Sequence, residues 1–349
     1  MLRDLRLRDF RCFEQLFFEP SPGLNLILGP NAQGKSSLLE AACILLRLQS
    51  PRSNSLLDAV RFGTPGFGLD GHWNERHMQV KLSASLKTFA LDSKPQSHSC
   101  DYFAIALVCW ISNDDMQLVR GPGASRRRYL DFLGAQVVPN YLRHLRAYER
   151  ALRSRNALLK ENRPNKEILA FDQPLLDAGE ALLSMRAQLC LDLGPRVSQA
   201  LRVISAGGEK LEISYQPGCS QTFAEALEAS RQEEMRLRMT VVGPHRDEIA
   251  ISLNGQNAAS FASEGQQRSI ALAMKLGQAG KLQAASDKPP LFLIDDIFGE
   301  LDPVRRNSLL AALPMSAQKL VTATTFHWLA SAEGAATFLL SGGQITRKS

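Results

Sequence analysis

Apolar and polar positions alternate in short stretches near the start of the chain and then change to a helical spacing. The runs LRLRDF and FEQLFF precede Pro-Ser-Pro-Gly at 20–23, and a mostly apolar run follows at 24–28. This pattern predicts a β meander that ends in a buried strand. The next stretch, 34–48, predicts a helix with one apolar face packed on a sheet. The residues on that face are Leu38, Leu39, Ala42, Leu45 and Leu46.

The spacing changes again further along the chain. Residues 66–111 alternate strand-like pieces with turns, whereas 123–205 follow a helical pattern with two long segments separated by a proline-containing turn. Strand-type alternation returns in KLEISYQ at 210–216. A helix at 265–282, a strand at 291–294 and a helix from Pro303 then complete the pattern.

This order of elements predicts an α/β fold in which mixed sheets surround the helix at 34–48. We expect one discontinuous domain, formed by residues 1–122 and 206–349, and an inserted, mainly helical lobe at 123–205. Internal repeats and low-complexity tails are not visible.

The amino-acid composition says more about the cellular compartment of the protein than about its function. The 349 residues are 44% hydrophobic and 22% charged, with a net charge of +6 and a pI near 9.1. The chain start is charged, and the longest apolar run falls short of the ~20 residues that cross a bilayer. Six cysteines are scattered without CxxC spacing. We therefore expect a cytoplasmic protein with reduced thiols, no membrane partner, and a metal that arrives with a substrate.

A phosphate-binding loop is the strongest motif. GPNAQGKS, from Gly29 to Ser36, fits G-x-x-x-x-G-K-[ST] and lies between the predicted strand and helix. A chance match is expected in roughly one chain in a hundred of this size. Lys35 is expected to reach the β- and γ-phosphates and Ser36 to ligate Mg²⁺; the alternative is a glycine turn that opens a helix. The predicted ATP-binding residues are Gly29, Pro30, Asn31, Ala32, Gln33, Gly34, Lys35, Ser36 and Ser37.

Two adjacent aspartates end the apolar run PPLFLIDD. In a P-loop fold an acid at this place holds magnesium, and a second acid beside it can polarise the attacking water. We assign Asp295 to the metal, together with Ser36, and Asp296 to catalysis. Two carboxylates this close raise the pKa of one of them, and Mg²⁺ relieves the conflict. The alternative is a strand that leaves the core with two solvated acids.

The segment ASEGQQRS begins another predicted helix. It resembles the S-x-G-Q signature of ATP-binding-cassette proteins, which contacts the γ-phosphate of ATP held by another subunit. The resemblance assigns that role, in trans, to Ser263, Gly265, Gln266 and Arg268. The structural alternative is a capping box formed by the serine and the glutamine. The two roles are compatible.

Two further segments resemble cassette motifs. Asp302 with Pro303 predicts a helix N-cap, and the same segment resembles a D-loop at a subunit interface. KLVTATTFHW resembles a switch strand, with Thr324 and Thr325 where many cassette ATPases have histidine. His327 is not aligned with that place, and we interpret it as a core or surface residue.

A basic stretch covers residues 120–166. It holds twelve Arg or Lys and three acids, a local charge of +9 that exceeds the charge of the whole chain. Spacings of 3, 4 and 3 place four arginines on one helix face, which predicts contact with the phosphate backbone of DNA. The alternative is a solvated face whose arginine stems cover apolar surface. These residues are Arg143, Arg146, Arg150 and Arg153.

Together these segments resemble the bacterial RecF family, in the SMC-like branch of the cassette ATPases. LRLRDFRCFEQL, LVRGPGASRRRYLDF, YERALRSRNALLK and VVGPHRDEI carry the resemblance over nearly the whole chain. It implies an ABC-type P-loop ATPase head with lobe I at 1–122 and 206–349 and a helical arm, lobe II, at 123–205. It also implies an ATP-gated homodimer with slow Mg²⁺-dependent ATPase activity that binds single-stranded and linear double-stranded DNA. The implied pathway has RecR and RecO as partners, RecA loading at gaps, and support of the SOS response.

The chain departs from the family pattern at two places. Ile111-Ser112-Asn113-Asp114 stands where a Pro-Glu-Asp run is expected, and Glu264 puts an acid inside the signature, where it is expected to slow ATP-driven closure. An ABC-transporter ATPase subunit shares the three main motifs, but it gives no reason for the basic helix. An SMC tether needs longer heptad repeats than this insert contains.

Overall fold

The computed structural model describes residues 1–53, 55–84, 86–96, 100–103, 105–205, 208–286, 288–324 and 334–348. It forms two compact units. The first combines Met1–Asp115 with Leu282–Ser349, and the second is Met116–Lys281. The first unit contains two six-stranded sheets, and the second has a smaller sheet among helices. The predicted α/β class is confirmed.

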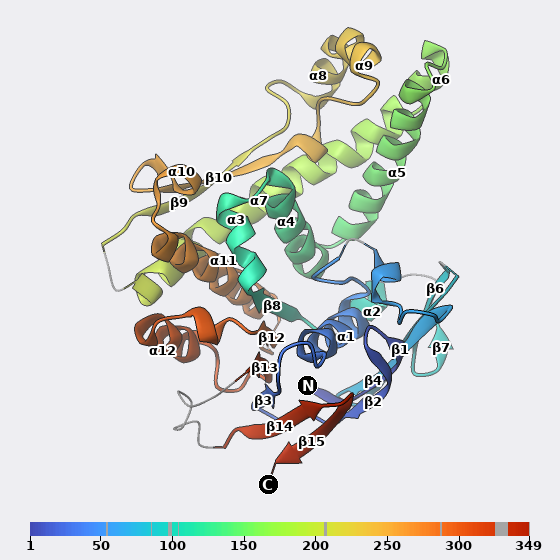
Figure 1. Ribbon diagram of the computed structural model, residues 1–349. Helices are drawn as coiled ribbons and strands as arrows, with labels where there is room; N and C mark the ends of the chain where they lie inside the picture. The colour runs from blue at the N-terminus through green and yellow to red at the C-terminus, as the bar shows by residue number, and fades with distance from the viewer. Residues whose placement is uncertain are drawn as a thin grey trace. The chain divides into compact units, whose positions relative to one another are not determined.

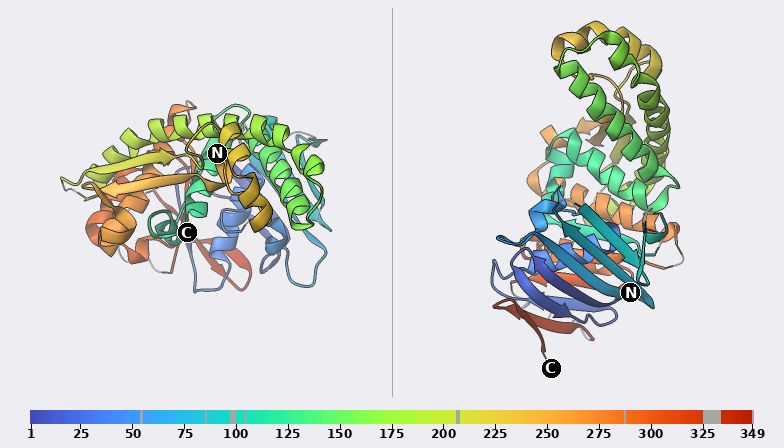
Figure 2. Two further views of the ribbon diagram at one scale, coloured as in Figure 1. Left: turned by 90° about the horizontal axis from the view of Figure 1, so that it is seen from above. Right: turned by 90° about the vertical axis from the view of Figure 1, so that its right-hand side faces the viewer.

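One sheet of the first unit is antiparallel and has the order β2-β1-β4-β5-β6-β7. Strand β4 alternates fully buried and half-buried residues, because one face of the sheet packs on the core. These strands are the dark-blue to teal arrows that lie side by side in the right-hand view of Figure 2. Their bounds are β1 Leu2–Phe10, β2 Phe13–Phe18, β4 Gly66–Trp73, β5 Arg76–Ser83, β6 Leu86–Leu91 and β7 Lys94–Pro95.

The other sheet has the order β15-β14-β3-β13-β12-β8, with all neighbours parallel except β15. The expected meander of three strands was therefore wrong, because only β1 and β2 pair, as a hairpin. Strand β3 leaves them and pairs with β13 and β14, since an apolar strand suits the middle of a parallel sheet covered on both faces. The bounds are β3 Leu24–Leu28, β8 Val108–Ser112, β12 Leu291–Asp295, β13 Lys319–Ala323, β14 Ala336–Ser341 and β15 Gln344–Lys348.

Helix α1, Lys35–Arg47, packs on both sheets (Figure 1). All of its residues except Ser36 are buried, so the predicted apolar face packs on a sheet and the opposite side of the helix is buried as well. A helix between two sheets has no solvent face, and its apolar residues can therefore occupy every side. The shorter helices of this unit are η1 Leu56–Ala59, α2 Cys100–Phe103, η4 Phe298–Glu300 and α12 Pro303–Ala312.

The second unit is built around helix α7, Asp172–Ser205, which packs on helix α5, Tyr141–Lys160, and on strand β9, Leu211–Gln216. Because β9 pairs with β10, this compact unit extends well beyond the stretch 123–205. The other elements are α3 Gln117–Arg120, α4 Gly123–Val137, α6 Asn165–Leu169, α8 Phe223–Ala229, α9 Arg231–Leu237, η3 Pro244–Arg246, β10 Glu248–Leu253, β11 Gln256–Asn257, α10 Ala258–Phe261 and α11 Glu264–Ala284. The short helix η2, Asn113–Met116, and the last turn of α11 cross the boundaries between the two units along the chain.

Among the helices of the described residues, none is both long enough and apolar enough to span a bilayer.

Candidate nucleotide site

The loop between β3 and α1 requires its two motif glycines on steric grounds. A Cβ on Gly29 would lie 2.2 Å from the Leu340 carbonyl oxygen, and one on Gly34 would lie 2.5 Å from the ring of Phe13. Both glycines also have positive φ, at 157° and 95°. A side chain at either place would push the loop out of its curl. The sequence pattern is therefore matched by the loop geometry that it predicted.

Lys35 closes this loop. Its ammonium donates hydrogen bonds to the carbonyl oxygens of Gly29, at 2.7 Å, and Pro30, at 2.8 Å. Burial lowers the pKa of Lys35, and the carboxylates of Asp296 and Asp295 partly oppose that effect. The charge of Lys35 is thus held at the loop, beside the two acids.

A three-residue hydrogen-bonded cluster joins the loop to the ends of two strands. Oδ1 of Asp295 accepts hydrogen bonds from the Ser36 hydroxyl, at 2.8 Å, and from the Thr322 hydroxyl, at 2.7 Å. Thr322 is fully buried on β13. Two residues predicted to share a metal ion therefore lie in direct contact, although 259 positions separate them in the sequence.

The second aspartate has a different environment. Asp296 takes a left-handed backbone conformation with φ 49°, and its N–H donates to Thr322 Oγ1 at 3.0 Å. Its carbonyl oxygen accepts a hydrogen bond from Asn113 Nδ2 at 3.1 Å. Burial raises the pKa of Asp296; Lys35 opposes the rise, and Asp295 adds to it. The surroundings of Asp296 therefore favour the protonated form of its carboxyl group.

A pocket of about 630 Å³ opens beside the loop. Its volume lies in the range of small-molecule sites. Its lining combines residues of the loop and Asp296 with residues that no sequence motif marks. The lining residues are Arg11, Cys12, Asn31, Ala32, Gly34, Lys35, Ser36, Ser37, Arg52, Asp58, Val60, Phe62 and Asp296. The side chain of Gln33 instead accepts a hydrogen bond from the Gly342 N–H, at 2.9 Å.

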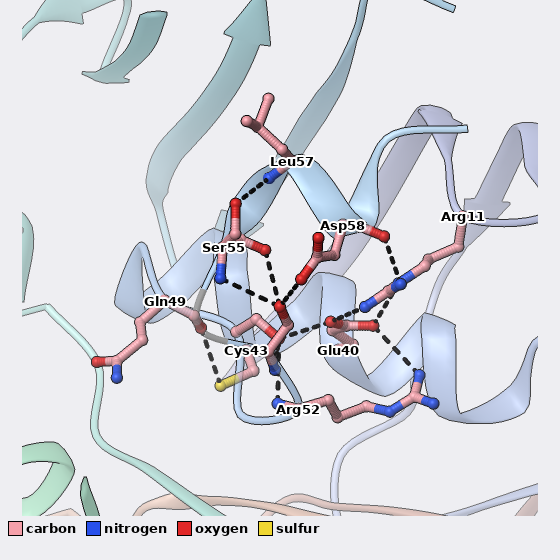
Figure 3. Close-up of polar contacts among 10 residues, drawn as sticks. Arg11, Glu40, Cys43, Gln49, Arg52, Ser55, Leu57 and Asp58 are labelled. Atoms are coloured by element: carbon pink, nitrogen blue, oxygen red, sulfur yellow. Dashed lines mark hydrogen bonds and ion pairs between the residues drawn. The ribbon is translucent and has the colours of Figure 1, made fainter. Parts of the chain in front are cut away.

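Two of the additional residues are arginines that converge on one buried carboxylate (Figure 3). Glu40 of α1 has no exposed side-chain surface, and its oxygens accept hydrogen bonds from Arg11, at 2.8 and 2.9 Å, and from Arg52, at 3.3 Å. The Ser50 hydroxyl also donates to Glu40, at 2.6 Å. The carboxylate therefore fixes two cations at the edge of the pocket.

The signature segment lies in the second unit and forms the expected capping box. The Ser263 hydroxyl accepts from the Gln266 N–H at 3.3 Å, and Gln266 Oε1 accepts from the Ser263 N–H at 2.8 Å. Glu264 is ion-paired with Arg268 at 3.3 Å, one helical turn away. Gly265 accepts a bond from the Ser269 hydroxyl. Glu264, the residue that departs from the family pattern, is thus paired with Arg268 of the same motif.

The N-cap role predicted for Asp302 is confirmed. Its Oδ1 accepts a hydrogen bond from the Arg305 N–H at 3.0 Å, and this bond lowers the pKa of Asp302. Of the residues near the expected switch, Thr324 is exposed just after β13, whereas Thr325 and His327 lie outside the described residues.

Comparison with known proteins covers almost the full chain. A relative from Anaeromyxobacter sp. (strain Fw109-5), named DNA replication and repair protein RecF, is 37% identical over 365 residues, covering 99% of this chain and 98% of its own. Proteins of the same name from Symbiobacterium thermophilum and Myxococcus xanthus are 35% and 32% identical, covering 93% and 98% of this chain and 91% and 96% of their own. This chain belongs to the RecF family. The family described as AAA domain also matches residues 4–96.

Solved structures agree with that membership. A structure of the recombination mediator protein RecF-ATP in the RecFOR pathway has a TM-score of 0.89 and 27% identity, covering 100% of this chain and 97% of its own. The head of an Smc protein bound to the C-terminal winged-helix domain of ScpA has a TM-score of 0.56 and 13% identity, covering 100% and 97%. The latter likeness shows the shared fold, that of an SMC-like ABC ATPase head. RecF membership does not favour the transporter-subunit alternative.

In this RecF-family chain, α5 presents the predicted arginines to solvent. Arg143, Arg146, Arg150 and Arg153 are all exposed. Arg155, on the same helix, is only 1% exposed and pairs with Asp172 and Glu234, at 2.8 and 2.7 Å. The basic stretch therefore mixes surface charge with structural ion pairs.

The VVGPHRDEI motif lies inside the second unit. His245 Nδ1 is 2.6 Å from the Tyr148 hydroxyl, and Nε2 is 2.9 Å from the Thr240 carbonyl oxygen. These partners assign the proton to Nε2. Asp247 accepts from Arg186, at 2.7 Å, and from the Tyr215 hydroxyl, at 2.6 Å. Within the second unit, the motif contributes to a buried polar network.

Proposed function

We propose that this RecF-family protein binds ATP with Mg²⁺ in the pocket beside α1 and acts as an ATP-gated, DNA-binding dimer in replication and repair. The observation that supports it most directly is the cluster of Ser36, Asp295 and Thr322. A hydroxyl and a carboxylate in contact form the hard oxygen donor set that Mg²⁺ prefers. The curled loop above them offers backbone N–H groups at a helix N-terminus, which suit phosphate.

Each residue of the pocket has a role in this proposal. Lys35 exchanges its carbonyl partners for phosphate oxygens, Ser36 and Asp295 hold the metal, and Thr322 orients Asp295. Bound Mg²⁺ neutralises charge on the phosphates. Asp296 accepts a proton from the attacking water, a role for which a raised pKa is suited. We expect slow hydrolysis, with ATP acting mainly as a switch.

The dimer part of the proposal concerns the signature. Ser263, Gly265, Gln266 and Arg268 of one copy are proposed to meet the γ-phosphate held by the other copy. Asp302 lies along the same subunit interface, and Thr324 and Thr325 sense the γ-phosphate. The capping box does not prevent this role, because the N–H groups at the first turn of α11 remain suited to an anion.

For DNA, we propose that the exposed arginines of α5 contact phosphates of single-stranded and linear double-stranded DNA. Residues 123–205 act as the arm in this proposal, and 1–122 with 206–349 as the ATPase lobe. The RecF relatives and the structure of RecF-ATP in the RecFOR pathway support a role in DNA replication and repair. From the resemblance of the sequence to the RecF family, we further propose that the protein acts with RecR, RecO and RecA at gaps in the cytoplasm and supports the SOS response.

The dimer is tested with Asp296→Asn, which keeps the shape of the side chain and removes the proton acceptor. We expect hydrolysis to fall by roughly a hundred-fold or more. Analytical ultracentrifugation with ATP and Mg²⁺ should show an accumulated dimer. Monomer alone under these conditions, with ATP bound, would contradict the gated dimer.

The DNA surface is tested with Arg146→Glu combined with Arg150→Glu. Affinity for linear duplex DNA should fall and its dependence on salt should flatten, because fewer counterions are released. Basal ATPase activity is expected to be unchanged. If DNA binding is unaltered across a salt series, these arginines form a solvated helix face and do not contact DNA.

A further inference from the structure

One apolar side chain at the pocket is unusually placed. Phe62 lines the pocket and is 100% exposed, whereas most aromatic side chains of this unit are packed in the core. A fully exposed phenyl ring loses the burial that normally stabilises an aromatic residue. An exposed ring at a binding pocket is instead available to contact a ligand.

The backbone that presents Phe62 is fixed. Val60 forms a β-bridge with Phe10, and the Arg61 N–H donates to the Asp9 carbonyl oxygen at 2.9 Å. The Arg11 N–H donates to the Ala59 carbonyl oxygen at 2.8 Å. The segment before Phe62 is thus attached to the end of β1 like a short extra strand. The exposure of the ring therefore does not follow from a loose connection.

The same segment is tied to the P-loop helix. The Arg11 guanidinium donates both to Glu40 and to the carbonyl oxygen of Asp58, and Arg52 reaches Glu40 from the other side (Figure 3). Glu40 lies five positions after Lys35 on α1. Glu40 therefore connects the P-loop helix, through Arg11, to the segment that leads to Phe62.

We propose that Phe62 is the platform on which the nucleobase of the bound nucleoside triphosphate stacks, and that the Glu40 cluster fixes its distance from the P-loop. This inference rests on the proposed function, because it assumes that a nucleotide occupies the pocket. Stacking uses the π-face that every base has, so the platform adds affinity with little selection among bases.

The test compares a ligand that has a base with one that lacks it. Calorimetry is carried out on the full chain with ATP, GTP and inorganic tripolyphosphate, each with Mg²⁺. Phe62→Ala should weaken ATP and GTP binding by roughly ten- to a hundred-fold and leave tripolyphosphate unchanged. Phe62→Trp should retain ATP binding, and its fluorescence should respond to ATP and not to tripolyphosphate. Phe62→Leu, which stays apolar but lacks a ring, should behave like the alanine variant.

Two controls separate the possible failures. Phe17→Ala removes an exposed phenyl ring of β2 that does not line the pocket, and it should change none of the affinities. Lys35→Ala should weaken all three ligands. If Phe62→Ala binds ATP normally while Lys35→Ala does not, Phe62 does not stack on the nucleobase, and the assignment of the P-loop as the phosphate site stands. If Lys35→Ala binds every ligand normally, the proposed function itself fails.

Discussion

Two parts of the chain are expected to meet phosphate groups, and they are built in opposite ways. In the P-loop pocket, Lys35, Ser36 and Asp295 are each held by hydrogen bonds to other residues of the same unit. On α5, Arg150 and Arg153 extend into solvent from a regular helix. The pocket can therefore select one ligand geometry, whereas the helix face supplies positive charge over an area. Replacements in the pocket should therefore weaken ligand binding by displacing the groups that contact the ligand. Replacements on α5 should weaken binding only when they change the charge of the helix face.

The largest expected effect is the loss of Lys35. Lys35→Ala should weaken ATP binding by roughly a hundred-fold, because charge-assisted hydrogen bonds to phosphate are lost. Calorimetry with ATP and Mg²⁺ measures the change. Lys81→Ala, an exposed lysine of β5, serves as the matched control and should bind normally. Equal affinities for the two variants would show that this end of the pocket does not hold phosphate.

The second prediction concerns acid and the interior of the second unit. Burial lowers the pKa of His245 to about 4 in the folded protein, whereas the histidine of the unfolded chain has its ordinary pKa of about 6.5. Between these two pH values, the unfolded chain binds a proton that the folded protein does not bind. The free energy of unfolding is therefore highest above pH 6.5 and decreases as the pH is lowered toward 4. At pH 5 it is lower by about 2 kcal/mol. Urea unfolding at pH 7.5 and pH 5 measures this loss. His245→Gln should show a loss smaller by that amount; an unchanged pH dependence would exclude His245 as its source.

A smaller effect is expected at Thr322, which no motif marked. Thr322→Val leaves the Asp296 N–H and a lone pair of Asp295 without their partner, and it should cost about 1–2 kcal/mol of stability. We also expect ATP hydrolysis to slow by about ten-fold, since both acids lose their support. Thr322→Ser keeps the hydroxyl and should retain most activity. Equal hydrolysis by the valine and serine variants would mean that this hydroxyl does not position the acids.

The smallest effect is expected from exchanging one cation for another on α5. Arg150→Lys with Arg153→Lys should change DNA affinity by less than about two-fold, because a phosphate-backbone surface needs charge and little geometry. Arg150→Gln with Arg153→Gln should reduce the slope of log affinity against log salt by about 2. A strong loss of DNA affinity in the lysine variant would show that these arginines contact DNA with a geometry as specific as that of the pocket residues.

The sequence predicted the parts of the pocket that lie within short segments. A P-loop joins one strand to the next helix, and Asp295 ends a five-residue apolar strand, so local pattern was sufficient for both. Likewise, the long helical periods of α5 and α7 appeared in the sequence before packing was known.

The remaining pocket residues could not be found in this way, because strand pairing and loop packing bring them together. Thr322 reaches the two aspartates only because β13 pairs with β12, and Asn113, at the end of β8, reaches the carbonyl oxygen of Asp296. Arg11 and Arg52 meet at Glu40 from separate loops. The departure from the family pattern at 111–114 was a usable signal for Asn113, since it marked the end of a strand beside the acids.

The left-handed backbone of Asp296 also has a consequence for the stability of the fold. A residue other than glycine in this conformation costs about 1 kcal/mol, although aspartate and asparagine tolerate it better than most residues. Replacing Asp296 with glycine would therefore relieve the backbone and, under the proposed role of this acid, abolish hydrolysis in the same step. The most stable residue at this position is thus not the one that the proposed chemistry requires.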